Sequence, residues 1–297
     1  MSSSNTAGVC GSKIAVFADS ACSVPAEDVE KYGIRVIPLQ VVYPDGSTYR
    51  DLVEIQPHEI YDRLHEAVPS TSLPFASDFL KAVEEVRAQG CTAIVGVTLG
   101  SVYSGTCDLF RRLLAEQTDM QSFVIDTYKL DYGAGVAAVM ACKLIEQGVP
   151  FEQLEQRLLD LGERSGALVT VSTLEHLIRG GRIGRAKGMV GTLLRVRPVL
   201  ACTTEGLKTL VQTRGDKAAR KRMVEEIADR VRHCPRVVAT VAHTACTETA
   251  EYVKNLLREA IPHVQVRIAE ASAVIGVHTG PGAVGVCYQG LCDGDPW

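Results

Sequence analysis

The feature that most constrains this chain is a junction of an apolar run, a hydroxyl-rich turn and an amphipathic segment. Residues 93–99 have the composition of a buried parallel strand, and the apolar residues of 107–114 recur at helical spacing. Between them lie Ser101, Ser104, Gly105 and Thr106. Because the first turn of a helix has unpaired N–H groups and a positive dipole, this junction suits an anion. Serine and threonine are also ordinary helix caps, so a purely structural role stays open.

Strands and helices alternate on both sides of this junction, which predicts an α/β fold. We expect two domains, each a mainly parallel sheet flanked by helices, with ligands at the carboxyl ends of strands. The predicted boundaries are a disordered tail over 1–12, an N-terminal α/β domain over 13–165, and a C-terminal α/β domain over 166–291. Residues 35–43 are expected to form one strand, 70–74 a loop and 275–282 a glycine-rich turn.

Polar residues follow several of the predicted strands or helices and are expected at one edge of the sheet. They are Asp19 and Ser20, Thr71 and Ser72, the hydroxyls of residues 101–106, and Asp126 and Thr127. We expect Asp19 and Asp126 to form structural hydrogen bonds.

The composition argues against several classes of function. A net charge of −4 and an aromatic content of 5% are unfavourable for nucleic-acid binding. The 10 cysteines form no Cys-x-x-Cys pair, the histidines form no His-x-x-x-His pair, and no Walker loop is present, so we expect no metal, cofactor or nucleotide site. Residues 1–12 lack the features of an export signal, and the longest apolar run is too short to span a bilayer, which predicts a cytoplasmic protein.

These stretches, in this order, resemble the DegV family of bacterial fatty acid-binding proteins, also called FakB. The most specific motifs are Gly180-Gly181-Arg182-Ile183 and His278-Thr279-Gly280-Pro281-Gly282. The resemblance implies a two-domain protein that encloses one long-chain fatty acid between its domains and has no catalytic machinery. It also implies a partner, a dihydroxyacetone-kinase-like fatty acid kinase, which converts the presented carboxylate to acyl-phosphate. Tyr103 and Phe75 are bulkier than the residues usual in the family, which predicts a shorter or bent tunnel.

The residues themselves agree with a carboxylate site, since a carboxylate in an apolar tunnel must keep its hydrogen bonds. The candidate ligands of the fatty acid carboxylate are Thr71, Ser72, Ser101, Ser104, Gly105, Thr106, His278 and Thr279. The alternative is a serine-dependent acyl hydrolase that uses Ser101 or Ser104 with His278, although neither serine lies in a Gly-x-Ser-x-Gly elbow. A purely regulatory lipid sensor would use the same pocket.

Residues 179–198 form a basic, amphipathic segment. It carries six arginines and lysines and no acid, and Leu193 and Leu194 fall on its apolar face. A basic rim beside an apolar strip favours a lid that docks transiently on a membrane surface. A core-facing helix with solvated arginines is the alternative. Arg182, Arg185, Leu193 and Leu194 are the residues expected to face the kinase or the membrane. The resemblance to the DegV family implies that Arg182 lies near the cargo head group.

Overall fold

The computed structural model describes residues 13–64, 66–189 and 196–296. Its N-terminal half is built on a four-stranded sheet of order β2-β1-β6-β7, in which every neighbouring pair is parallel. The strands are β1 (Ile14–Asp19), β2 (Arg35–Ile37), β6 (Ala93–Thr98) and β7 (Gln121–Asp126). All residues of β6 are buried, as expected for a parallel strand covered on both faces. The prediction of a parallel sheet is therefore confirmed for this half.

Helices cover both faces of the parallel sheet. On one face lie α3 (Ala76–Ala88) and α4 (Thr106–Ala115), where Phe79 packs edge-on against Phe17 and Phe110. On the other lie α1 (Ala26–Tyr32), α5 (Tyr132–Glu146) and α6 (Phe151–Glu163). A Cβ on Gly135 of α5 would lie 2.2 Å from the carbonyl oxygen of Cys22. This glycine therefore lets α5 approach the turn after β1.

The C-terminal half is built on a six-stranded sheet of order β10-β9-β8-β13-β11-β12. Its strands are β8 (Ser165–Thr170), β9 (Arg197–Thr203), β10 (Gly206–Thr213), β11 (Arg236–His243), β12 (Val264–Glu270) and β13 (Val284–Leu291). Only β11 and β12 are parallel neighbours, and all other pairs are antiparallel.

The prediction that the second domain also has a mainly parallel sheet is therefore wrong. Strand–helix alternation gives a parallel pair only where the strands that a helix connects become neighbours, as with β11, α9 (Thr247–Ala260) and β12. By contrast, β9 and β10 form a hairpin through a tight turn, and β13 returns between β8 and β11, antiparallel to both. The sequence pattern does not show where this last strand inserts.

A small antiparallel sheet of order β4-β3-β5 completes the strands, with β3 (Gln40–Val42), β4 (Thr48–Arg50) and β5 (Ser70–Ser72). The single strand predicted over 35–43 is thus two strands in different sheets, separated at Pro38, which has no N–H to give to a ladder. The predicted loop over 70–74 begins as β5. The predicted glycine-rich turn over 275–282 is for the most part the short helix α10 (Ala273–Thr279).

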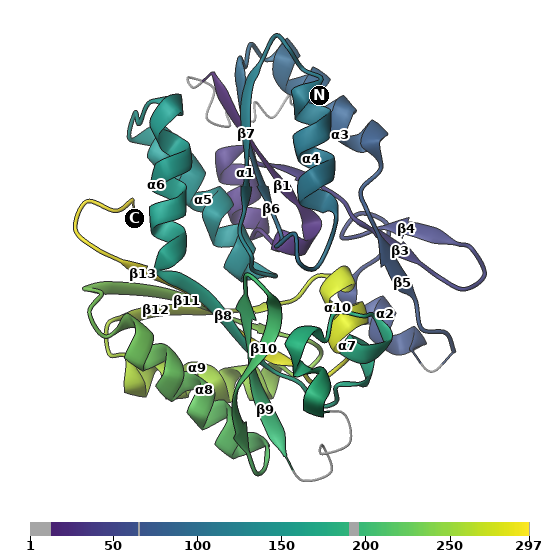
Figure 1. Cartoon of the computed structure of the whole chain (residues 1–297), viewed down its shortest axis with the longest axis vertical. Coiled ribbons are helices and arrows are strands. Elements are labelled where there is room, and N and C mark those ends of the chain that lie inside the picture. The colour runs from purple at the N-terminus through teal and green to yellow at the C-terminus, as the bar shows by residue number, and fades with distance from the viewer. Residues whose placement is uncertain (1–12, 65, 190–195, 297) are drawn as a thin grey trace, which may run out of the picture.

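The remaining helices complete a layered structure (Figure 1). α8 (Asp216–Val231) and α9 cover the outer face of the six-stranded sheet, whereas α5 and α6 lie between the two large sheets. α2 (Pro57–Arg63), α7 (Glu175–Arg179) and α10 gather beside the small sheet, and the 3-10 segment η2 (Gly184–Met189) packs against β10. The division of the chain into folding domains over 13–165 and 166–291 stays a prediction. The predicted tail, residues 1–12, lies outside the described residues.

Candidate functional site

A cavity of about 330 Å³ lies where the small sheet, the carboxyl ends of the parallel strands and the helices α7 and α10 meet. Its walls combine residues from both halves of the chain. The apolar lining is Ala21, Leu39, Leu73, Leu99, Tyr103, Leu130, Val169, Val171, Leu177, Leu207, Val274 and Ile275. The other lining residues are Thr71, Ser72, Ser104, Gly105, Arg182, His278 and Thr279. The structure therefore brings six of the eight predicted carboxylate ligands, and Arg182, to one apolar cavity.

His278 joins the two glycine motifs at this cavity. It is on α10, and its Nε2 lies 2.8 Å from the Oγ1 of Thr71 on β5. A Cβ on Gly180 would lie 2.1 Å from His278 Nδ1, and a Cβ on Gly280 would lie 2.3 Å from the ring of His176. The ring of His278 thus packs against Gly180, and the ring of His176 packs against Gly280. A side chain at either glycine would overlap a ring, which is why glycine is needed at both positions.

The N-terminus of α10 is held by a carboxyl group from the other half of the chain. The Val274 N–H donates to Asp51 Oδ1 over 3.4 Å, and Asp51 is fully buried. Burial raises the pKa of Asp51 to about 6, and hydrogen bonds from Ser20 and the first turn of α10 oppose that rise. Asp51 therefore helps to place the helix that carries His278, although the sequence gives no sign of this long-range contact.

The charge state of His278 follows from its surroundings. Burial, with a smaller contribution from the positive charge of Arg182, lowers the pKa of His278 to about 4. At neutral pH the ring is therefore uncharged, with one nitrogen able to donate and the other able to accept a hydrogen bond. Its Nδ1 is buried and has no partner among the described residues.

Arg182 supplies the positive charge at the cavity. Its Nε donates to the carbonyl oxygen of Tyr103 over 3.1 Å, and its Nη1 donates to the carbonyl oxygen of Gly180 over 2.6 Å. No carboxylate in the described part of the chain forms an ion pair with it. The guanidinium is thus oriented by backbone carbonyls, and its charge is not neutralised.

The hydroxyl-rich junction contributes less to the cavity than its sequence indicates. Ser104 and Gly105 line the cavity, whereas Ser101 and Thr106 do not. The Ser101 N–H donates to Asp126 over 3.0 Å, and Thr106 is fully buried beneath Ser104, with 2.8 Å between their hydroxyl oxygens. Ser101 and Thr106 are therefore not part of the anion site, and they do not cap α4 either, because its N-cap is Gly105 and forms no side-chain cap hydrogen bond.

Asp19 and Asp126 hold the backbone around this junction, which confirms their predicted structural role. Asp19 accepts from the Leu99 N–H over 2.8 Å, and Asp126 accepts from Ser101 and, over 3.1 Å, from the Tyr128 N–H. Complete burial raises the pKa of Asp19 to about 7. Both carboxyl groups fix the loop that presents Ser104 to the cavity.

A smaller space adjoins the cavity. A second space of about 60 Å³ shares Leu130, Val169, Ile275 and Thr279 with the first. Its walls also include Ala167, Cys202 and Cys287 from the six-stranded sheet. We call the two spaces together the tunnel. Its wide chamber carries Thr71, Arg182 and His278, and its narrow chamber lies against the six-stranded sheet.

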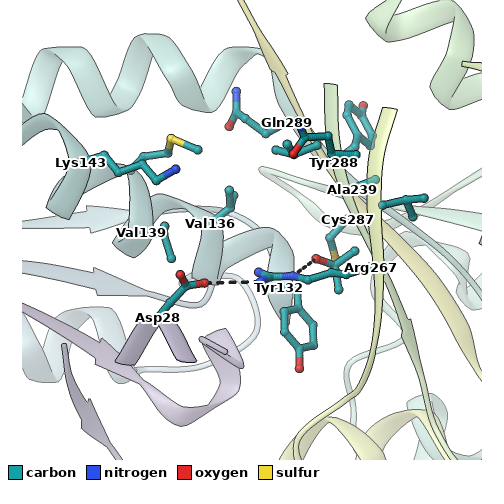
Figure 2. A pocket seen from close by; sticks show the side chains of 15 residues that line it. Asp28, Tyr132, Val136, Val139, Lys143, Ala239, Arg267, Cys287, Tyr288 and Gln289 are labelled. Atoms are coloured by element: carbon teal, nitrogen blue, oxygen red, sulfur yellow. Dashed lines mark hydrogen bonds and ion pairs between the residues drawn. The ribbon is translucent and has the colours of Figure 1, made fainter. Parts of the chain in front are cut away.

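A separate cleft of about 330 Å³ lies between α5 and the outer strands of the six-stranded sheet (Figure 2). Arg267 of β12 crosses it, with its Nη1 3.2 Å from Glu27 and 3.4 Å from Asp28 of α1. Lys143 and Gln289 also line this cleft. None of the predicted site residues lies in it.

Part of the positive charge of the basic segment is neutralised by ion pairs in the structure. Arg179 pairs with Glu175, Arg185 with Glu205, and Arg197 with Asp216, at 2.7, 2.6 and 2.6 Å respectively. Each acid comes from outside the segment. Leu193 and Leu194, predicted to face the kinase or the membrane, lie outside the described residues. In the described part of the chain, no helix has the length and apolar character needed to cross a bilayer.

Comparison with known proteins identifies the fold and the motifs together. The DegV family profile, described as an uncharacterised protein family, matches residues 13–290. The chain belongs to the DegV family. A DegV domain-containing protein of Clostridium acetobutylicum is 35% identical over 92% of this chain and 98% of its own length.

Two further DegV-family similarities carry a functional name. A fatty acid-binding protein of Thermotoga maritima is 30% identical over 92% of this chain and 96% of its own length. A solved structure of a DegV family protein from Thermus thermophilus, described by its fatty acid binding, superimposes with a TM-score of 0.87 at 29% identity, covering 94% of this chain and 99% of that one. The α/β fold of this chain is thus that of solved DegV structures.

Proposed function

We propose that this DegV-family protein binds one long-chain fatty acid in the tunnel, with the carboxylate at the wide chamber and the acyl chain among the apolar walls. The observation that carries the proposal is Arg182, a guanidinium that has no carboxylate partner among the described residues and lies at the same cavity as the hydrogen-bonded Thr71 and His278. An apolar tunnel with one such charge matches an amphipathic anion. The fatty acid-binding relatives support the same ligand class.

The polar residues of the wide chamber meet the needs of a carboxylate. Burying a charged group without hydrogen bonds is very costly, and charge-assisted hydrogen bonds are the strong ones. Arg182 supplies N–H donors, Thr71, Ser72 and Ser104 supply hydroxyls, and the neutral ring of His278 supplies one N–H. Thr71 and His278 contact each other in this structure, so a carboxylate has a preformed pair to bind.

The hydrogen-bond pattern favours a carrier over a hydrolase. The His278 Nε2 is paired with Thr71, and Ser104 is paired with Thr106, so neither serine of the junction has a histidine base. Among the described residues, no carboxylate is hydrogen-bonded to His278 Nδ1 to orient the ring. A nucleophilic serine needs both contacts.

We further propose that the bound carboxylate is presented to a separate, dihydroxyacetone-kinase-like kinase, and that the protein docks transiently on membranes in the cytoplasm. Large apolar side chains are exposed on the segments that form the wide chamber, namely Leu73, Phe75, Val102 and Ile178. Exposed apolar side chains that gather around one chamber are typical of an interaction surface. Arg182 lies between α7 and η2, and Arg185 lies in η2.

The test of ligand binding is native mass spectrometry of the purified chain, followed by extraction and identification of the lipid. We expect one fatty acid per chain, and uptake of added oleate by delipidated protein. Protein that is empty and takes up no fatty acid would overturn the proposal. An esterase assay on the same sample should show no turnover, since turnover would support the hydrolase. ATP-dependent acyl-phosphate formation should require an added kinase of the stated class.

A further inference from the structure

Two small side chains stand side by side in the wall of the narrow chamber. Its volume of about 60 Å³ holds on the order of five water-sized groups, which is a few terminal methylenes of an acyl chain. Ala167 of β8 and Cys287 of β13 are opposite each other in the antiparallel pair and are both buried. The length of chain that fits therefore depends on these two residues.

Cys287 is packed directly against the middle layer of helices. A Cβ on Gly133 of α5 would lie 3.5 Å from the Cys287 sulfur and 3.1 Å from the Cβ of Ala167. The three residues are in close contact, with no room for an acyl chain to pass between them. The wall of the narrow chamber is thus closely packed at these residues.

The far side of this wall is the cleft of Figure 2, which Cys287 also borders. That cleft is lined by apolar residues such as Val136 and Val139 as well as by Lys143, Arg267 and Gln289. The close packing of the wall at Cys287, and not the polarity of the cleft behind it, therefore ends the acyl site there.

We infer that Cys287, with the facing Ala167, is the stop for the methyl end of the acyl chain and sets the longest fatty acid that this protein accepts. This inference rests on the proposed fatty acid binding and adds a residue that determines chain-length specificity. Neither residue touches the carboxylate.

The test measures dissociation constants for even-numbered saturated fatty acids from 12 to about 20 carbons on delipidated protein. Cys287→Leu adds two carbon-sized groups to the chamber, and Ala167→Val also adds two, so both should shift the optimum toward shorter chains. Each excluded methylene lowers the relative affinity for the longest chain about fourfold. Cys287→Ala should shift the optimum toward longer chains. Cys142→Ala is the matched control, because Cys142 is a buried cysteine of α5 outside the tunnel lining, and its length profile should equal the parent's.

The outcomes separate this inference from the proposed function. If the parent binds no fatty acid of any length, the proposed function fails. If the parent binds fatty acids and the tunnel variants, folded by their melting curves, keep its length profile, the inference alone is overturned. Cys287→Ala removes a single atom, so the test remains decisive if the larger substitutions do not fold. Opposite shifts in Cys287→Leu and Cys287→Ala support the stop.

Discussion

The tunnel and the cleft of Figure 2 differ in charge although the wide chamber of the tunnel and the cleft each measure about 330 Å³. Each contains one arginine from the C-terminal half of the chain. Arg267 in the cleft pairs with Glu27 and Asp28, and its Nε donates to Thr240 over 3.1 Å. Arg182 in the tunnel contacts only backbone carbonyls among the described residues. Volume alone therefore does not make an anion site, because a guanidinium already paired with carboxylates has little attraction left for a ligand.

The largest effect on fatty acid binding should appear when each of the two arginines is replaced in turn by methionine. Arg182→Met should weaken fatty acid binding roughly ten- to 150-fold, since a hydrogen bond to a charged group contributes about 1.5–3 kcal/mol. Arg267→Met should leave the affinity within about twofold, because its charge is already neutralised. Displacement of a fluorescent fatty acid measures both. Equal losses in the two variants would mean that the comparison is mistaken.

A glycine substitution tests the packing behind the anion site. Gly180→Ala places a Cβ 2.1 Å from His278 Nδ1, so the ring must move away from Thr71, and we expect an affinity loss of about tenfold. Gly162→Ala on α6 is the control, because nothing lies within 4 Å of its added Cβ. A helical glycine-to-alanine change should stabilise by about 0.5–1 kcal/mol. Thermal unfolding and ligand displacement check both variants, and unaltered binding by Gly180→Ala would show that the ring position is unimportant.

Two threonines permit a smaller, nearly isosteric comparison. Thr71→Val removes the hydroxyl beside His278 and should lower fatty acid affinity about three- to tenfold, as one lost hydrogen bond predicts. Thr240→Val removes the hydroxyl that contacts Arg267 in the cleft and should leave the affinity unchanged. Isothermal titration with one fatty acid is sufficient. A loss in Thr240→Val matching that of Thr71→Val would place the ligand in the cleft.

The last effect concerns stability and not binding, namely the pH dependence that His278 gives to stability. Its pKa is about 4 in the folded chain, against about 6.5 when unfolded. Between these values the unfolded chain holds a proton that the folded chain does not, so the free energy of unfolding falls as pH is lowered from about 6.5 to 4.

His278→Gln should remove this contribution, measured as the difference from the parent in urea unfolding across that pH range. Arg267→Met should keep it, because that arginine lies in the other cavity. Bound fatty acid should reduce it, since a nearby carboxylate favours the charged ring. A pH-independent difference between parent and His278→Gln would contradict the assignment.

Local sequence pattern predicted those parts of the fold in which neighbours in sequence are also neighbours in space. The strand predicted over 93–99 is β6, and the helix predicted over 107–114 is most of α4. These predictions succeed because burial and helical periodicity are patterns over a few neighbouring residues. The same logic failed for the six-stranded sheet, where β13 pairs with strands far away in the sequence. Strand order is decided by long-range pairing, to which local periodicity is insensitive.

The candidate site shows the same division between local and long-range information. The sequence by itself determined the chemistry of the site, since the motifs and their order along the chain identify the hydroxyl residues, Arg182 and His278. Only the tertiary structure decided which of them meet. In the described part of the chain, His278 lies against Thr71, Arg182 has no carboxylate partner, Asp51 lies at the start of α10, and the Ser101 N–H donates to Asp126. The physical reason is that residue type sets which hydrogen bonds a group can form, whereas the packing of β5, α7 and α10 sets which partner is within reach.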